Sequence, residues 1–248
     1  GLVRAFAVRD GRAMLRARFV ETAKRRIETA AGRIVQPGFA TPARPGAVVG
    51  SADDTNAANT HVIAAGGRLL ALWEAGSPHA LDPATLATSG PVTFRPDLKG
   101  MPFLAHPKVE ASGRIWNIGL SGKSAFVWRL SAAGALEAGQ LIKLPRASYM
   151  HDFTMTQRHL IIVLQPWLHE TADMPFSRGM RWRPEQGTRV LVIDKDDLTK
   201  QRVFELPALF FFHLGDGWDD KDGSIHFDGA FDDSPLFATE TAPALVEG

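Results

Sequence analysis

Residues 188–206, TRVLVIDKDDLTKQRVFEL, contain two short apolar segments that flank a polar turn. Thr188–Ile193 and Gln201–Leu206 are rich in Val, Leu, Ile and Phe, residue types that favour strands. Asp194–Asp197 between them has the composition of a turn. Both segments have the length of a strand and are too short for an ordinary helix. The stretch therefore predicts a β-hairpin.

The same strand–turn–strand unit occurs three more times along the chain. The other units are Leu2–Val8 and Ala13–Val20 around Asp10-Gly11, Leu69–Trp73 followed by the turn segment Leu81–Leu86, and Ala125–Leu130 with Gln140–Leu144 around Gly134. The turns are separated by roughly 50–70 residues, which suits propeller blades with loop insertions better than a β-sandwich. We expect an all-β chain in which residues 1–248 form part of one propeller domain. A single helix is predicted at Ala23–Ala31, with Thr22 as N-cap and Gly32 at its end.

Composition excludes several classes of protein. Lys plus Arg (28) nearly cancels Asp plus Glu (27), so no basic field predicts nucleic acid as a partner. The chain has no cysteine, which excludes disulfides, thiolate catalysis and iron–sulfur clusters and fits a reducing compartment. Its longest apolar runs fall far short of the roughly 20 residues that a membrane helix needs. We expect a soluble, cytoplasmic protein.

Three of the eight histidines stand beside apolar, strand-like segments. His106 precedes the strand-like stretch Arg114–Leu120, His151 heads a predicted strand, and His213 follows the run Leu209–Phe212. If each blade contributes one inner strand, equivalent strand ends converge on the propeller axis and would gather these side chains. An all-imidazole set suits iron, zinc, copper or nickel and is a poor match for magnesium or calcium.

Glu74 is the candidate for a supporting residue. It ends the apolar segment Leu69–Glu74, and a carboxylate beside a metal-binding histidine can accept the N–H that faces away from the metal. The alternative is a solvated residue at a strand end.

Two other metal-binding patterns are set aside. His226-Phe227-Asp228 is half of a facial triad, but no histidine follows it to complete the set. The acidic stretch Asp216–Asp222 lacks the spacing of a calcium loop, and we expect it to form a solvated turn.

In their order along the chain, these segments resemble the motifs of the carotenoid cleavage oxygenases. That family carries N-T-x-V, a strand reading L-L-A-L-x-E, then A-H-P, M-H-D-F and F-H-x-x-N-[AG]-[WY]-E. The corresponding segments here are Asn59–Val62, Leu69–Glu74, Ala105–Pro107, Met150–Phe153 and Phe212–Asp219, with Gly1–Phe6 similar to the family's G-M-V-H-A-F strand and Trp182–Arg189 similar to a further segment.

The resemblance implies a seven-bladed β-propeller, of which this chain covers about four blades. It implies Fe(2+) on the propeller axis, held by four histidines and supported by glutamates. His106, His151 and His213 would take three of the ligand positions, and Glu74 one supporting position. The implied reaction adds O2 across a conjugated double bond of an apolar small molecule and gives two carbonyl products.

The chain departs from the family pattern in two ways. Asp216 replaces the usual Asn and Asp219 the usual Glu of the third histidine motif. The fourth histidine of the family normally lies in an H-G-F context near the C-terminus, and no such motif occurs before Gly248. We therefore expect the fourth ligand to lie outside this chain and the 248-residue chain alone to be inactive.

The resemblance also bears on substrate and partners. Members that cleave hydroxylated stilbenes tend to carry Lys immediately before the strand-end Glu, where this chain has Trp73. The expected substrate is therefore an apocarotenoid-like polyene, with a stilbene as the alternative. A metal-free propeller that serves as a binding scaffold is the alternative from another class. The candidates for peripheral membrane contact are Met101–Leu104, and Trp167-Leu168 with Met174–Phe176.

Overall fold

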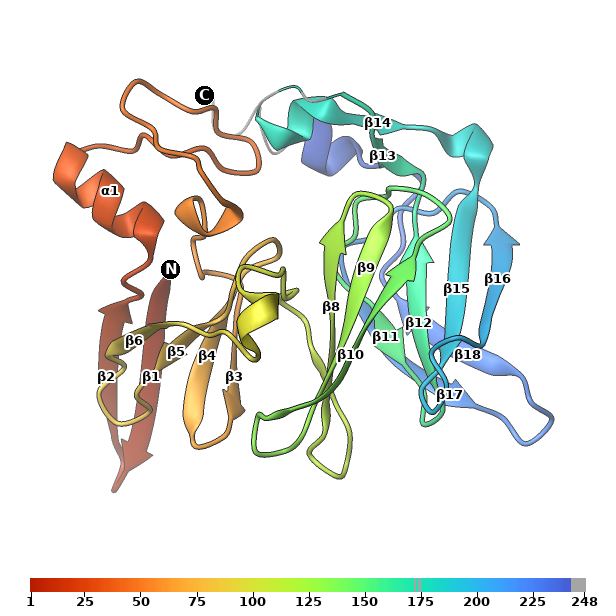
Figure 1. Ribbon diagram of the computed structural model, residues 1–248, viewed down its shortest axis with the longest axis horizontal. Coiled ribbons are helices and arrows are strands. Elements are labelled where there is room, and N and C mark those ends of the chain that lie inside the picture. The colour runs from red at the N-terminus through yellow and green to blue at the C-terminus, as the bar shows by residue number, and fades with distance from the viewer. Residues whose placement is uncertain (172, 174, 242–248) are drawn as a thin grey trace. The chain divides into compact units, whose positions relative to one another are not determined.

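The computed structural model describes residues 1–171, 173 and 175–241 (Figure 1). Within these residues the chain is built from antiparallel β-sheets and has one α-helix, α1 (Ala23–Ala31). No helix in this part of the chain is long and apolar enough to cross a membrane. The predicted all-β class is confirmed.

Three sheets have four strands, and in each the strands lie side by side in chain order. They comprise β3 (His61–Ala65), β4 (Arg68–Leu72), β5 (His79–Leu81) and β6 (Thr88–Pro91); β7 (Lys108–Val109), β8 (Ile115–Ser121), β9 (Ser124–Leu130) and β10 (Leu136–Lys143); and β11 (Thr154–Met155), β12 (His159–Leu164), β15 (Thr188–Asp194) and β16 (Gln201–Leu206). A four-stranded antiparallel meander is the blade of a β-propeller.

Three further sheets have two strands each among the described residues. They are β1 (Leu2–Arg9) with β2 (Arg12–Phe19), β13 (Trp167–His169) with β14 (Met180–Trp182), and β17 (Leu214–Asp219) with β18 (Ile225–Gly229). The β13–β14 hairpin is an insertion between β12 and β15, which pair directly with each other.

The local chemistry that predicted these elements is present in the structure. Asp10 and Gly11 have φ values of 51° and 70° in the β1–β2 turn, as the two central residues of a tight hairpin turn require. The Thr22 side chain accepts a hydrogen bond from the Arg25 backbone N–H (3.2 Å) and so caps α1. Gly32 ends the helix with φ of 63°.

The chain divides into two compact units, each with its own core. The first comprises Gly1–Pro37, Ala43–Leu120 and Phe126–Gly139, and its core includes Leu70, Phe103 and Trp128. The second comprises Gly38–Pro42, Ser121–Ala125 and the described chain from Gln140 onwards, with Ile161, Val190 and Phe211 in its core. The assignment of residues 1–248 to a single propeller domain stays a prediction.

Burial explains the sequence pattern of the second unit's main sheet. Leu160–Leu164 of β12 are all buried, whereas every residue of the edge strand β16 is exposed. A strand that is covered on both faces needs apolar residues at every position, while an edge strand does not. This accounts for the continuous apolar run in β12 and the mixed sequence of β16.

Burial of a histidine in the first unit is expected to make the free energy of unfolding depend on pH. His79 in β5 is 3% exposed, and its Nδ1 has no hydrogen-bond partner among the described residues. Burial lowers the pKa of His79 below its ordinary 6.5, against an opposing effect of the Asp53 carboxylate. The unfolded chain therefore binds a proton more readily than the folded protein does below about pH 6.5.

We expect the free energy of unfolding to fall as pH decreases below 6.5, by up to about 1.4 kcal/mol per pH unit from this residue. In His79→Phe this loss between pH 7.5 and 5.5 is expected to disappear. Urea unfolding of both proteins at the two pH values measures it. His226→Phe, which changes a largely exposed histidine, is the control, and an equal pH slope in wild type and His79→Phe would contradict the assignment.

Candidate metal centre

The three candidate histidines share one position in the architecture: each comes just before the first strand of a sheet. His106 precedes β7, His151 precedes β11 and His213 precedes β17. The first strands of successive sheets are equivalent elements, so the chain presents an imidazole at the same point three times. This regularity agrees with the expectation that equivalent positions of successive blades carry the histidines.

One detail of that expectation is wrong. The apolar run Leu209–Phe212 before His213 is not a strand, and only Phe210 forms a bridge, to Asp232. The reason lies in the Gln165 side chain, which accepts a hydrogen bond from the Phe211 N–H (3.2 Å) and donates one to the Phe211 carbonyl (3.1 Å). A buried side chain thus satisfies backbone groups that a neighbouring strand would otherwise bind.

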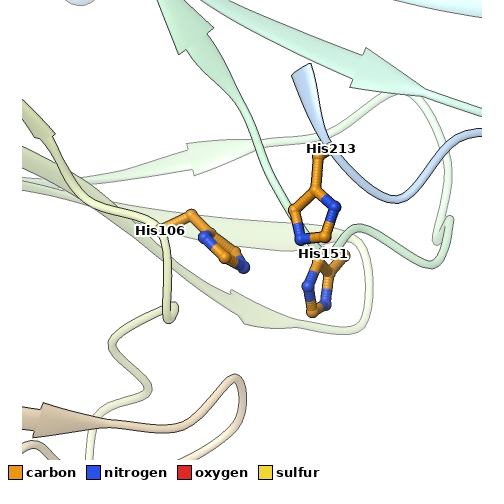
Figure 2. A group of neighbouring side chains, drawn as sticks. All are labelled: His106, His151 and His213. Carbon is orange, nitrogen blue, oxygen red and sulfur yellow. The ribbon is translucent and has the colours of Figure 1, made fainter. Parts of the chain in front are cut away.

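His151 and His213 are neighbours within the second unit, as Figure 2 shows. Their ring centroids are 4.9 Å apart with an interplanar angle of 75°, and a ring nitrogen of one lies within 4.8 Å of a ring nitrogen of the other. The pairing follows from the packing of β11 against β17, where the Thr154 hydroxyl donates to the Gly215 carbonyl (2.8 Å). Two strands that lie together bring together the residues that precede them.

Two aromatic side chains lie beside His151. The Phe212 ring is perpendicular to that of His151, with centroids 5.7 Å apart. The Tyr149 hydroxyl lies 3.5 Å from Nδ1 of His151. His151 is half-buried and His213 is exposed. One ring is thus held in an apolar setting while the other can be reached from solvent.

The donor chemistry of the pair fits a transition metal. Imidazole nitrogens bind first-row metals at about 2.0–2.1 Å, which places two nitrogens on one ion roughly 3–4 Å apart. A separation within 4.8 Å is close to this range, and rotation of an exposed side chain such as His213 can shorten it. The two residues therefore fit a shared iron, zinc, copper or nickel ion.

His106 lies in the first unit, and its segment is fixed there by two side chains. The buried Asn117 amide donates to the Leu104 carbonyl (2.7 Å), and Nδ1 of His61 lies 3.0 Å from the Ala105 carbonyl oxygen. The His61 and His106 rings are 5.9 Å apart between centroids. His61 lies within the Asn59–Val62 motif, but nothing in the sequence around it predicts this contact.

Glu74 also belongs to the first unit. It follows the last residue of β4, Leu72, by two positions and is half-buried in a turn. The apolar strand therefore ends two residues earlier than the predicted segment Leu69–Glu74, and the supporting role stays a prediction.

The acidic stretch is only partly the turn that the sequence predicted. Asp216 and Asp219 belong to strand β17, and the turn begins at Asp220. Asp219 lies 2.9 Å from Nδ1 of His159 at the opposite end of β17 from His213. Partial burial by itself raises the pKa of Asp219, but hydrogen bonds from Thr156 and His159 outweigh it and leave the pKa below its ordinary value. This carboxylate thus links the end of β17 to His159 at the start of β12.

His226 is not part of a metal cluster among the described residues. Its Nε2 lies 2.9 Å from the Asp220 carboxylate, and its ring stacks on Trp218 with centroids 5.3 Å apart. Both rings are substantially exposed, so they form a pair on the surface of the β17–β18 hairpin.

The segments proposed for membrane contact are mostly buried. Phe103, Leu104 and Trp167 are each 1% exposed. Phe103 and Trp167 pack within hydrophobic clusters of their own units. Phe176 is 37% exposed, and Met174 lies outside the described residues. Among the described residues of these two segments no continuous exposed apolar patch is present, and membrane contact stays a prediction.

Four-stranded antiparallel meanders in chain order are typical of a β-propeller protein, and in this chain a candidate histidine precedes the first strand of three of the sheets. A model of the RPE65 family, described as retinal pigment epithelial membrane protein, matches residues 1–246. The chain belongs to this family of carotenoid oxygenases. The resemblance inferred from the motifs is confirmed.

Curated relatives include enzymes that act on different substrates. Resveratrol cleavage oxygenase 1 of Aspergillus fumigatus is 28% identical over 96% of this chain and 49% of its own length. Apocarotenoid-15,15'-oxygenase of Synechocystis is 29% identical over 92% of this chain and 50% of its own length. The chain thus spans about half the length of the curated relatives it matches.

Solved structures agree with the fold. A crystal structure of a D477G ACO/RPE65 chimera has a TM-score of 0.82 and 25% identity, and covers 94% of this chain and 52% of the chimera. Cobalt-substituted Synechocystis ACO has a TM-score of 0.78 and 26% identity, and covers 94% of this chain and 52% of its own. The described sheets are consistent with a partial propeller of this kind.

Proposed function

We propose that the full-length protein is a non-haem Fe(2+) dioxygenase that cleaves a conjugated C=C bond with O2 and releases two carbonyl products. The observation that carries the proposal is the imidazole pair of His151 and His213, 4.9 Å apart between ring centroids, in a chain of this family. His106 is the third proposed ligand, because it lies in the family's A-H-P motif and precedes the first strand of its sheet, β7, as the other two histidines precede β11 and β17. A relative that accepts cobalt in place of its own metal supports a metal centre in this family.

The side chains of this chain would bind and orient the metal. The Tyr149 hydroxyl, 3.5 Å from Nδ1 of His151, can accept the N–H of that ring and so direct Nε2 to the ion. Glu74 would do the same for one of the ligand imidazoles. Bound iron would supply the redox chemistry that allows O2 to react with a double bond. Phe212 and Tyr149, which lie beside His151, would shield this ligand from water.

A fourth histidine is proposed outside these 248 residues, because the relatives are about twice as long and the family motif for it is missing here. We accordingly propose that this chain alone does not turn over substrate.

The proposed substrate is an apocarotenoid-like polyene, with a hydroxylated stilbene as the alternative. Relatives that act on either kind of compound are similarly distant from this chain, at 28% and 29% identity. Trp73 favours the polyene, because an indole offers an apolar surface and no positive charge for a phenolate. The half-buried Trp73 immediately precedes Glu74, so a cation at this position would lie close to the proposed supporting residue.

We expect Trp73→Lys to shift substrate preference towards hydroxylated stilbenes. The ratio of kcat/KM for resveratrol to that for an apocarotenal should rise about tenfold or more, equivalent to about 1.4 kcal/mol of differential transition-state binding. Trp73→Phe, which removes the indole without adding charge, should leave the ratio near that of wild type. A wild-type protein that already prefers resveratrol would overturn the polyene assignment.

Elemental analysis of the full-length protein, purified without a histidine tag, tests the proposed function. About one iron per chain, together with two carbonyl products from a polyene or stilbene under O2, is the expected result. Iron that stays absent after anaerobic Fe(2+) loading would leave the metal-free binding scaffold as the better account. Turnover by the isolated 248-residue chain would contradict the proposal that the fourth ligand lies elsewhere.

A further inference from the structure

We propose that Gln165 and Asp152 are positioning residues that hold the His151 and His213 segments in register for metal binding. This inference rests on the proposed function, since it assigns the two side chains to the same centre. Neither residue contacts substrate or metal in this proposal. Both act through the backbone of the segments that carry the histidines.

Gln165 joins the two segments on the side that precedes the histidines. It directly follows β12 and its side chain is completely buried. Its Nε2 donates to the carbonyls of Tyr149 (3.3 Å) and Phe211 (3.1 Å), and its Oε1 accepts from the Phe211 N–H (3.2 Å). Tyr149 and Phe211 each lie two residues before a histidine. A single amide thus fixes the approach of both segments.

Asp152 joins the segments on the side that follows the histidines. It comes directly after His151 and is 2% exposed. One carboxylate oxygen accepts from the Leu214 N–H (3.0 Å), and Leu214 comes directly after His213. The other oxygen accepts from the Phe153 N–H (2.8 Å). Gln165 therefore joins the two segments before the histidines, and Asp152 joins them after the histidines. We refer to these two side chains as the clamps.

These clamps replace the strand pairing that the two segments lack. Residues 151–153 and 211–213 are not in strands, so no ladder of backbone hydrogen bonds sets their relative position. Metal ligands need placement within about 0.5 Å, which loops alone rarely provide. A buried apolar residue could fill the same space, but only a fully hydrogen-bonded polar side chain specifies which backbone groups must meet.

The test compares two identical substitutions at buried glutamines. Gln165→Met removes all three hydrogen bonds of the clamp with little change in volume. Gln36→Met is the matched control: Gln36 is also completely buried and makes three hydrogen bonds to backbone, to Val48 and Asp54, but it lies in the first unit. Both variants are expected to lower thermal stability to a similar degree.

Cobalt binding distinguishes positioning from folding. The full-length proteins are titrated anaerobically with Co(II) at 10 °C, well below both unfolding transitions, and the visible absorption of the bound ion is recorded. Gln165→Met is expected to bind cobalt about 10–100-fold more weakly and with an altered spectrum, the size of effect typical of residues that orient metal ligands. Gln36→Met should keep the wild-type affinity and spectrum.

Asp152→Asn is the second variant, and it still tests the proposal if Gln165→Met does not fold. It retains one acceptor oxygen but places an amide NH2 where a backbone N–H needs an acceptor, so an altered spectrum is again expected. Wild-type cobalt binding in both clamp variants, or equal weakening in Gln36→Met, would overturn the positioning role. Wild-type protein that binds no cobalt would instead overturn the proposed metal centre.

Discussion

Replacement of His151 by Ala is expected to abolish stoichiometric metal binding. His151 is the half-buried member of the imidazole pair. Alanine has no ring nitrogen, so only His213 of the pair could still bind the metal. Residues that only orient a metal ligand typically contribute 10–100-fold to affinity, so loss of a direct ligand should cost at least about 100-fold, or about 2.7 kcal/mol. Iron per chain in the full-length protein should fall from about one to below a tenth.

The matched control is His226→Ala in the same unit. His226 lies on the surface of β18, is bonded to Asp220 and stacks on Trp218, so its removal should not change the iron content. Circular dichroism and urea unfolding of both variants verify that the fold is kept. A His151→Ala protein that retains most of its iron would rule out this residue as a ligand.

The elements that local chemistry specifies were predictable from the sequence. Helix α1 begins and ends where Thr22 and Gly32 predicted, because an N-cap hydroxyl and a glycine with positive φ act within a few residues of themselves. The β1–β2 and β15–β16 hairpins formed for the same reason, since their turns contain Asp10-Gly11 and Asp194–Asp197. Alternation between apolar runs and such turns was enough to indicate an all-β chain.

Long-range bonds from side chains to the backbone were not predictable in this way. Leu209–Phe212 has the composition of a strand, yet Gln165, far away in sequence, satisfies the Phe211 backbone. No local pattern marks Gln165, because a buried glutamine and an exposed one look alike in sequence. Asp152 was visible within the M-H-D-F motif, but its bond to Leu214 became apparent only with the fold.

The candidate histidines show both a property that local sequence predicts and one that depends on long-range contacts. Their selection from eight required only the neighbouring motifs, which are local. The closeness of His151 and His213 depends on β11 lying against β17, a tertiary contact that no residue spacing encodes. His61 was passed over because its partner, the Ala105 carbonyl, lies in another segment of the chain.

Among the substitutions proposed for this protein, replacement of Arg146 by Met is expected to cause the largest loss in the free energy of unfolding. Arg146 is 7% exposed, and its guanidinium donates to the Ser148 hydroxyl (3.1 Å) and to backbone carbonyls. The carbonyl acceptors are those of Leu164, Gln186 and Gly187. Burial lowers the pKa of Arg146 to about 10, with the nearby charge of Arg189 acting in the same direction, so the side chain is still a cation at pH 7.

Methionine fills similar space but leaves these acceptors without a donor. The bond to the Leu164 carbonyl is buried, whereas those to Gln186 and Gly187 are partly buried, so water can replace part of the loss. A buried polar group without a partner costs about 1–3 kcal/mol, so we expect the free energy of unfolding to fall by about 2–4 kcal/mol in total. Arg146→Lys should recover only part of the loss, because an ammonium group cannot reproduce the planar fork of donors. Urea unfolding of the full-length protein at pH 7 measures each value.

Arg202→Met on the edge strand β16 provides the control for removal of an arginine as such. Its guanidinium lies 5.7 Å from the centre of the Phe204 ring on an exposed strand, and such a contact contributes about 0.5–1 kcal/mol. The same small loss in Arg146→Met would show that water replaces the guanidinium at the three carbonyls. A large loss would identify Arg146 as the residue that joins its own segment to the end of β12 and the start of β15.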